Sequence, residues 1–402
     1  MRRRWSINGR FLTQKITGVQ RYAREIVSAI DMLAADGHPL ARELDLTLLV
    51  PGSYQGPLPA YETIRIRTVG RLKGHAWEQI ELPVHARGGI LSLCNTGPLL
   101  RRKQIVCIHD LNPFLFPNSY SSLFRAGYGM VVPALGRTAA GLATVSQFSA
   151  QLLVEHRIAR GRTPTIAVNG HEHVRCWSPR AGAPARPHAS TVLLLGSQAR
   201  HKNISIVLGL APRLAARGID VAVVGGRTPR VFGQFALPPE QQTGIRRLGA
   251  VSDDDLASLM QTSLCLAFPS LMEGFGLPPL EAMALGCPVV ASNCASLPEV
   301  CGDAALYASP TDPEEWLSRL VTLHDDPRLR QTLIAKGRAK AESFSWTRSA
   351  EIYLNALAEV DGVPAEDRAT VSPMRLPLCV AGPGLSPDQD CPSPPAGAPS
   401  HL

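Results

Sequence analysis

The sequence has no uninterrupted apolar run near the roughly 20 residues that a helix needs to cross a bilayer. Three arginines follow Met1, and no apolar segment of secretory length comes after them. Aromatic residues make up only 5% of the chain and no known nucleic-acid-binding motif is present, which disfavours a base-stacking surface. We therefore expect a cytoplasmic protein that does not bind nucleic acid.

The nine cysteines form no C-x-x-C pair and no Cys/His ligand spacing, so neither a zinc site nor a disulfide framework is expected. The composition is that of a globular protein, with 45% hydrophobic and 18% charged residues. A chain of 402 residues is long enough for two domains, each with its own core. The net charge of +8 suits anionic partners, among which we favour an acidic membrane surface over nucleic acid.

The most informative stretch is 264–292, which predicts a buried strand, a glycine loop, a short helix and a second, parallel strand. Gly274 and Gly276 leave backbone amides open to the close approach of a ligand. The prolines at 278 and 279 suit the first turn of a helix, and Gly286 closes it. The helix N-terminus is therefore expected to bind an anion such as a phosphate.

Two carboxylates, Glu273 and Glu281, bracket this helix start. Glu281 is expected in the first turn, where a negative charge stabilises the helix by about 0.3–1 kcal/mol without any ligand. Glu273 lies alone in a glycine loop and has no comparable structural role. Glu273 is therefore the stronger candidate for a functional carboxylate.

Strands and helices alternate along the chain, which predicts an α/β protein with doubly wound parallel sheets. We expect a first domain at 1–172, a linker at 173–190, a second domain at 191–345, a last helix at 346–361 and a disordered tail at 362–402. The linker and the tail are identified by their Pro, Gly, Ala and Ser content and by the loss of periodicity.

Polar or glycine residues follow several of the expected strands, where such sheets place their ligand contacts. His109 and Asp110 follow a strand at 104–108, Gly18 precedes a helix at 19–30, and Lys202 follows a strand at 191–196. Each also has a structural explanation: a histidine that caps a loop, a turn glycine and a solvated lysine. Ser252 and the acidic residues 253–255 are expected to cap a helix rather than to bind a metal.

The spacing Glu273-x7-Glu281 resembles the E-x7-E motif of retaining family 4 glycosyltransferases, the kind used in bacterial polysaccharide synthesis. Residues 17–22 look like the G-V-x-R-Y segment of that family, and 106–111 look like its V-x-x-H-D-L segment. The resemblance extends to about residue 360. It implies the GT-B fold, in which two Rossmann-like domains face each other across a cleft and the C-terminal helix crosses back to the first domain.

The resemblance implies a role for each candidate residue. Glu273, His109 and Lys202 are the implied catalytic residues: Glu273 and His109 would contact the donor sugar and Lys202 the leaving diphosphate. The implied substrate-binding residues are Gly18, Asp110, Arg200, Val251, Gly274, Phe275, Gly276, Leu277 and Glu281, with Glu281 on the ribose and Val251 in the nucleobase pocket. The family has an arginine at the position of Ser197, and Arg200 is the candidate to replace it.

The implied activity is transfer of a hexose or deoxyhexose from a nucleotide diphosphate sugar to a hydroxyl of a glycan. The acceptor is expected to be lipid-linked, in cell-envelope or exopolysaccharide synthesis at the inner face of the membrane, with no cofactor and no metal. Two alternatives stay open at this point. One is a catalytically silent GT-B subunit that binds nucleotide and scaffolds an assembly, and the other is a sugar-nucleotide epimerase or hydrolase.

Overall fold

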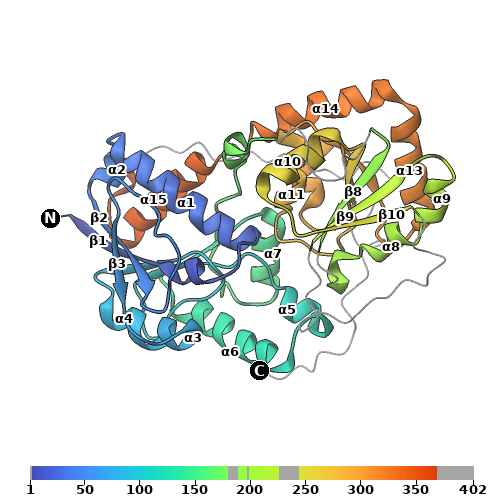
Figure 1. Cartoon of the computed structure of the whole chain (residues 1–402). Coiled ribbons are helices and arrows are strands. Elements are labelled where there is room, and N and C mark those ends of the chain that lie inside the picture. The colour runs from blue at the N-terminus through green and yellow to red at the C-terminus, as the bar shows by residue number, and fades with distance from the viewer. Residues whose placement is uncertain (1, 180–188, 197–198, 226–243, 369–402) are drawn as a thin grey trace. The chain divides into compact units, whose positions relative to one another are not determined.

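A computed structural model describes residues 2–179, 189–196, 199–225 and 244–368. The chain forms two compact units (Figure 1). Unit 1 contains residues 2–111, 126–170 and the described residues from Phe344 onward. Unit 2 contains the segment Asn112–Arg125 and the described residues of His171–Ser343.

Unit 1 is built on a seven-stranded sheet in the order β3-β2-β1-β4-β5-β6-β7, and all neighbouring strands run parallel. The order reverses between β1 and β4, which makes their carboxyl ends the topological switch point of a doubly wound sheet. The strands are β1 Arg3–Asn8, β2 Leu44–Pro51, β3 Arg65–Val69, β4 Gly89–Ser92, β5 Gln104–Cys107, β6 Gly141–Thr144 and β7 Thr165–Ile166.

Two helices from opposite ends of the chain pack together in unit 1, α1 Gly18–Ala35 and α15 Trp346–Val360 (Figure 1). The Tyr22 ring meets Trp346 edge-on at 5.6 Å, and its hydroxyl lies 3.0 Å from that of Tyr353. Ser349 Oγ donates to the carbonyl of Val168 at 2.6 Å. The last helix therefore returns to the first unit, as expected. The other α-helices of unit 1 are α2 Pro39–Arg42, α3 Gly74–Ala76, α4 Leu82–His85, α7 Gln147–Glu155 and most of α6 Ser122–Thr138.

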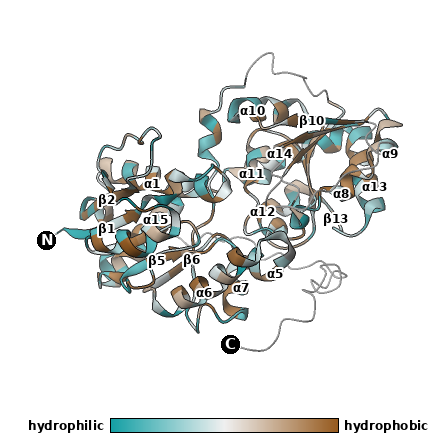
Figure 2. Cartoon of the chain, turned by 60° about the horizontal axis from the view of Figure 1, so that its bottom comes forward, coloured by the Kyte–Doolittle hydropathy of each residue, from teal (hydrophilic) through white to brown (hydrophobic). Residues whose placement is uncertain are grey.

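Unit 2 repeats the same topology with six parallel strands in the order β10-β9-β8-β11-β12-β13. The strands are β8 Thr191–Leu195, β9 Asp220–Val224, β10 Ile245–Gly249, β11 Cys265–Phe268, β12 Val289–Ser292 and β13 Ala305–Ala308. The strands are largely hydrophobic (Figure 2). Leu194, Ala267 and Trp316 are fully buried members of the hydrophobic core of this unit. The helices are α8 Ser205–Leu208, α9 Ala211–Ala215, α10 Asp253–Thr262, α11 Leu277–Ala284, α12 Leu297–Cys301, α13 Pro313–Asp325 and α14 Pro327–Ala341.

The predicted doubly wound α/β fold is confirmed, but some boundaries differ. The sequence 77–83 predicts a short helix that stops at its proline. Residues 74–85 instead form one continuous helical run through Pro83. A π-helical turn at Trp77–Glu81, in which the Leu82 N–H donates to the Trp77 carbonyl, widens the helix ahead of the proline ring. The sequence also predicts one helix over 204–214, but this segment is divided into α8 and α9 by Gly209 and Leu210.

The segment Asn112–Arg125 was expected in the first domain but belongs to unit 2. It contains α5 Asn112–Leu115 and the start of α6 Ser122–Thr138. Its aromatic rings explain the assignment, because Tyr120 stacks on His201 with 6.3 Å between ring centroids and Phe116 lies at 6.1 Å from the same ring. A 3₁₀ helix of unit 2, Glu172–Cys176, begins at the last residue of the expected first domain and includes the first four residues of the expected linker, 173–176. Residues 180–188 of that linker and 369–402 of the expected tail lie outside the described residues.

In the described part of the chain, no helix is both long and apolar enough to cross a membrane. The seven cysteines of that part are free thiols. Within the same residues, no group of three or more His, Cys, Asp or Glu side chains is placed to hold a metal ion.

Candidate active site

The strand order of unit 2 reverses between β8 and β11, so the loops that leave the carboxyl ends of these two strands meet at a switch point. The loop after β8 carries Arg200 and Lys202, and the loop after β11 carries Glu273 and the glycines. The topology therefore brings together two groups of residues that are about 70 positions apart in the sequence. This is the location at which doubly wound sheets bind their ligands.

Lys202 and Glu273 form an ion pair across this switch point, with 2.7 Å between Nζ and Oε1. The pair is shielded but reachable, since 26% of the lysine side chain and 12% of the glutamate side chain are exposed. The ammonium also lies 5.6 Å from the centre of the Phe268 ring. Lys202 ends a short 3₁₀ helix, Arg200–Lys202, which Asn203 closes in the left-handed conformation. The sequence predicted both residues, and the structure brings them into contact.

The glycine loop is fixed from three sides. Ser296 Oγ hydrogen-bonds to the carbonyls of Glu273 and Phe275, at 3.0 and 2.8 Å. Cys294 Sγ contacts the Leu271 carbonyl at 3.4 Å, and the Leu271 N–H donates to the His201 carbonyl at 2.8 Å. The carboxylate of Glu273 is therefore presented by a backbone whose position is set by its neighbours.

Helix α11 starts directly after this loop, as predicted. Gly276 caps it with a φ of +104°, which favours glycine, and a Cβ there would lie 2.9 Å from Leu297 Cδ2. The side chains of Phe275 and Leu277 are buried, while Pro278 and Pro279 occupy the first turn. The amides of 274–277 thus mark the positive end of an eight-residue helix.

The prediction that Glu281 lies in the first turn of the helix is wrong. Helix α11 begins at Leu277, so Glu281 is its fifth residue and comes after the first turn. Its carboxylate is instead buried against His173, with 3.0 Å between Oε1 and Nε2 and side-chain exposures of 6% and 3%. The His173 ring meets Trp177 edge-on at 5.4 Å. Sequence reasoning missed His173 because that position was assigned to a linker.

The other predicted residues of unit 2 have different surroundings. Arg200 is exposed at the start of the 3₁₀ helix. Val251 is half-buried in the loop between β10 and α10, at the carboxyl edge of the sheet. Ser197, which occupies the position of the family's arginine, lies outside the described residues.

In unit 1, His109 follows β5 and is 5% exposed. Its backbone N–H donates to Asn95 Oδ1 at 2.7 Å, and its Nε2 lies 2.8 Å from the Leu93 carbonyl. Burial lowers the pKa of the imidazole to about 4, against the smaller opposing effect of that hydrogen bond. The ring is therefore neutral at pH 7, and because Nε2 faces a carbonyl and carries the proton, Nδ1 is a hydrogen-bond acceptor.

Gly18 begins α1, where Thr17 and Gln20 form a capping box. Gln20 Nε2 donates to Gln14 Oε1 at 3.0 Å, which ties the helix start to the preceding loop. Asp110 is half-buried, and its carbonyl accepts from the Tyr128 hydroxyl at 2.9 Å. The predicted residues of unit 1 thus lie after β1 and β5, at the carboxyl edge of the first sheet.

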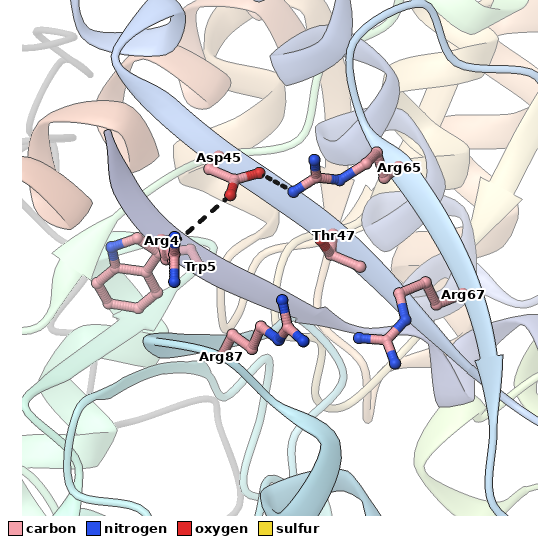
Figure 3. Close-up of a pocket in the computed structure, with 7 residues that line it drawn as sticks. All are labelled: Arg4, Trp5, Asp45, Thr47, Arg65, Arg67 and Arg87. Atoms are coloured by element: carbon pink, nitrogen blue, oxygen red, sulfur yellow. Dashed lines mark hydrogen bonds and ion pairs between the residues drawn. The ribbon is translucent and has the colours of Figure 1, made fainter. Parts of the chain in front are cut away.

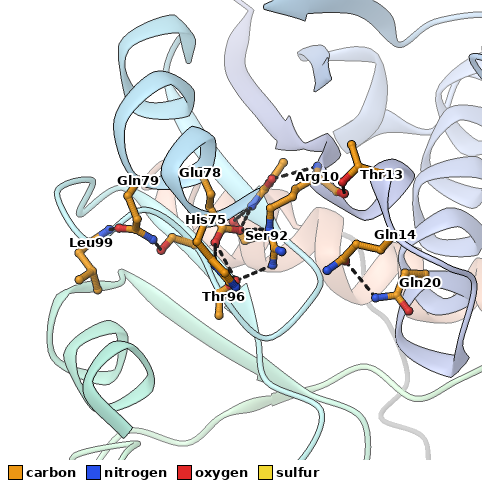
Figure 4. Close-up of polar contacts among 12 residues, drawn as sticks. Arg10, Thr13, Gln14, Gln20, His75, Glu78, Gln79, Ser92, Thr96 and Leu99 are labelled. Carbon is orange, nitrogen blue, oxygen red and sulfur yellow. Dashed lines mark hydrogen bonds and ion pairs between the residues drawn. The ribbon is translucent and has the colours of Figure 1, made fainter. Parts of the chain in front are cut away.

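A buried polar network at the switch point of unit 1 was not predicted (Figure 4). The Glu78 carboxylate is fully buried and accepts from Arg10 Nε at 2.9 Å, Asn8 Nδ2 at 2.7 Å and Thr96 Oγ1 at 2.8 Å. Burial alone would raise its pKa, but the hydrogen bond from His75 and the charge of Arg10 outweigh burial and lower the pKa to about 2. The network joins the loops after β1 and β4, so it fixes the backbone at this edge of the first sheet.

Residues 181–340 match the family model described as "Glycosyl transferases group 1". This part of the chain is a group 1 glycosyltransferase domain. The domain contains the Lys202–Glu273 pair, Arg200, Val251 and Glu281.

Curated relatives of the chain include several mannosyltransferases. The chain is 45% identical over 126 residues to O-antigen chain mannosyltransferase B of Escherichia coli. The aligned region covers 31% of this chain and 33% of that protein. The chain is 29% identical over 255 residues to an MMP alpha-(1->4)-mannosyltransferase of Mycolicibacterium hassiacum, covering 59% and 60%. It is 27% identical over 239 residues to O-antigen chain mannosyltransferase RfbU of Salmonella typhimurium, covering 58% and 64%. The chain thus spans less than two thirds of each of these proteins.

Solved structures with the same fold include a sucrose-phosphate synthase from Thermosynechococcus elongatus, with a TM-score of 0.65 and 16% identity over 90% of this chain and 100% of that one. WaaG, a glycosyltransferase involved in lipopolysaccharide biosynthesis, has a TM-score of 0.62 and 18% identity over 88% and 99%. These structural similarities, which cover about nine tenths of the chain, confirm the predicted GT-B fold.

The stability of the glycosyltransferase domain is expected to fall with acid because of His201. Burial and the charge of Lys202 lower the pKa of this histidine from 6.5 to about 4, so the unfolded chain binds a proton that the folded domain does not. The contribution of His201 to stability is present above pH 6.5 and is lost as the pH falls toward 4. We expect His201→Gln to remove about 2 kcal/mol of the stability difference between pH 7 and pH 4.5, measured by urea unfolding.

The matched control is His156→Gln, because His156 is exposed on unit 1. It should leave the difference between the two pH values unchanged. An equal difference in wild type and His201→Gln would contradict the prediction, whatever the absolute stability of the variant.

Proposed function

We propose that the chain transfers mannose from a nucleotide diphosphate sugar to a hydroxyl of a growing glycan in O-antigen or related polysaccharide synthesis. The observation that carries this proposal is the Lys202–Glu273 pair at the switch point of the glycosyltransferase domain. The choice of mannose is supported by relatives that are named mannosyltransferases.

The diphosphate of the donor binds next to Lys202 in this proposal. The ammonium and the amides of 274–277 supply positive charge where the leaving group gains negative charge. Arg200 adds a second cation from the same 3₁₀ helix, and Gly18 supplies an amide at a second helix start. Since these groups neutralise the diphosphate, the reaction needs no metal ion and no other cofactor.

Glu273 holds hydroxyls of the sugar and stabilises the positive charge that develops at its anomeric carbon. His109 accepts a hydrogen bond from a sugar hydroxyl through Nδ1, and Asp110 holds the loop that carries it. The bond from the anomeric carbon to the diphosphate oxygen breaks, and a bond to the acceptor oxygen forms on the same face. The acceptor proton passes to the departing diphosphate. Because the new bond forms on the face that the diphosphate leaves, the configuration at the anomeric carbon is retained.

Glu281 binds the ribose hydroxyls, and the backbone around Val251 lines the base pocket. Because His173 orients the Glu281 carboxylate, we expect Glu281→Gln to raise the KM for the donor about tenfold with little change in kcat. His173→Gln should show the same split between KM and kcat at a smaller size. A large fall in kcat with an unchanged KM would instead place Glu281 at the reacting atoms.

A donor panel tests the proposed function. The full chain is incubated with GDP-, UDP- and dTDP-sugars and a polyprenyl-diphosphate-linked glycan, and both nucleotide release and the anomeric configuration of the product are measured. We expect GDP-mannose to be used and an α-linked product to form. Binding of a nucleotide sugar without turnover on any acceptor would favour a silent scaffold, and turnover without an acceptor would favour a hydrolase or an epimerase.

The lipid-linked acceptor places the enzyme at the inner face of the membrane in this proposal. The net charge of +8 supports contact with an anionic surface. If the protein binds vesicles that carry the lipid-linked glycan but not the same vesicles without the glycan, the membrane contact is due to the acceptor alone.

A further inference from the structure

Unit 1 contains a hollow that no proposed step of sugar transfer uses (Figure 3). It has a volume of about 210 Å³ and is lined by Arg4, Trp5, Asp45, Thr47, Arg65, Arg67 and Arg87. We refer to it as the arginine pocket. Four of its seven lining residues are arginines, which is unusual for a surface formed by a doubly wound sheet.

Strand register explains why these side chains converge. Arg4 is paired with Asp45, Thr47 with Arg65, and Leu49 with Arg67 across three neighbouring parallel strands. Since side chains alternate between the faces of a strand, positions 4, 45, 47, 65 and 67 share one face of the sheet. Arg87 reaches the same hollow from the residues before β4 (Figure 3).

The arginine pocket and the predicted site residues of unit 1 lie at opposite ends of the strands of the same sheet. Arg4 is the second residue of β1, Asp45 the second of β2 and Arg65 the first of β3, so the pocket sits near the amino ends of the strands. The polar network and the start of α1 follow the carboxyl ends. Within unit 1, the pocket is therefore separate from Gly18, His109 and Asp110, which lie at the carboxyl ends of the strands.

The charges in the pocket do not balance. Four guanidinium groups and one carboxylate leave three net positive charges in one hollow. Asp45 is shared between Arg65, to which it hydrogen-bonds, and Arg4, whose Nε lies 3.7 Å away. Among the described residues, no ion pair or hydrogen bond engages the guanidinium of Arg67 or Arg87. Both of these arginines are exposed. Like charges held this close favour an anion between them.

We infer that the arginine pocket binds a phosphate or diphosphate group, at a site distinct from the donor site. Guanidinium groups bind phosphate oxygens in a bidentate manner, and several arginines around one hollow match the charge of a multiply ionised phosphate. A volume of about 210 Å³ is below the range of about 300–1,000 Å³ typical of sites for whole small-molecule ligands, so the pocket suits a phosphate group rather than a complete nucleotide sugar. The group belongs either to a free phosphorylated compound or to a lipid headgroup.

Protection of individual arginines from phenylglyoxal tests this inference on the full chain. The rate of modification is followed for each arginine by peptide mass spectrometry, without addition, with pyrophosphate, and with phosphatidylglycerol vesicles at matched ionic strength. Because the readout is specific to each residue, binding of pyrophosphate next to Lys202 does not interfere. Arg160, which is exposed elsewhere on unit 1, is the internal control.

We expect pyrophosphate to slow modification of Arg67 and Arg87 by at least about fivefold and to leave Arg160 unchanged. Protection by vesicles of phosphatidylglycerol, but not of phosphatidylcholine, would identify the lipid headgroup as the source of the phosphate. Pyrophosphate should also protect Arg65 in the wild-type chain, and this protection should disappear in the variant Arg67→Gln/Arg87→Gln. Equal modification rates with and without both probes, or protection of Arg160 to the same extent, would overturn the inference.

Discussion

Glu273→Gln is expected to lower the rate of sugar transfer by about 100- to 1,000-fold. The substitution keeps the size of the side chain and removes the negative charge that faces the anomeric carbon in the proposed complex. It also leaves the ammonium of Lys202 without its charged partner at 2.7 Å. Steady-state kinetics with the donor and a glycan acceptor measure the effect, which should appear in kcat more than in the KM of the donor.

Glu314→Gln is the matched control for this variant. Glu314 also pairs with a cationic side chain, that of Arg213, but on the exposed surface of unit 2, where the glutamate side chain is 66% exposed. The control should keep wild-type kinetics. If Glu273→Gln retains more than about half of the wild-type kcat while it stays folded, Glu273 does not stabilise the reacting sugar.

Lys202→Met is expected to lower kcat by a similar factor, about 100-fold or more, because the leaving diphosphate loses its nearest cation. Methionine keeps the apolar stem of the side chain but removes the ammonium, which lies 5.6 Å from the centre of the Phe268 ring. The variant should also lose most of the preference for a nucleoside diphosphate over the corresponding monophosphate, since the two ligands differ by the phosphate that Lys202 contacts. Calorimetric titration with both nucleotides measures this preference.

Lys336→Met provides the control for a lysine pair of the same geometry. Lys336 Nζ lies 2.7 Å from Asp303 Oδ2, the same distance as in the Lys202–Glu273 pair, but both side chains are largely exposed. The preference for the diphosphate should be unchanged in this control. An unchanged preference in Lys202→Met as well would place the diphosphate elsewhere.

Local signals in the sequence were sufficient to predict the stretch 264–292. The glycines and prolines there determine where a strand, a loop and a helix must begin and end, and such effects act within a few residues. The parallel direction of the strands was also predictable, because nearly continuous apolar strands are typical of parallel sheets buried on both faces. The observed β11, α11 and β12 accordingly match the expected elements.

Contacts between distant positions were not predictable in the same way. The hydrogen bond between His173 and Glu281 joins residues 108 positions apart, and that between Glu78 and Asn8 joins residues 70 apart. Neither follows from periodicity, because side-chain pairing depends on which loops the sheet topology brings together. Pro83 failed as a helix stop for a related reason: a π-helical turn accommodated the ring, and the buried Glu78 network holds that turn.

The two carboxylates also show the difference between a motif and its geometry. Glu273 and Glu281 have the spacing of the motif, but the structure places the two carboxylates in different surroundings. Glu273 contacts the cation of the neighbouring loop at the switch point, whereas Glu281 is buried against a histidine. The two carboxylates thus have different surroundings, and their roles toward the sugar and the ribose stay predictions.

A side-by-side assay of wild type, Glu273→Gln and Lys202→Met measures nucleoside diphosphate release that depends on the sugar donor and the acceptor. We expect steady release by wild type with GDP-mannose and a fall of about 100-fold or more in each variant, with both variants folded by circular dichroism. Release by both variants at the wild-type rate would show that the switch point between β8 and β11 is not the reaction centre.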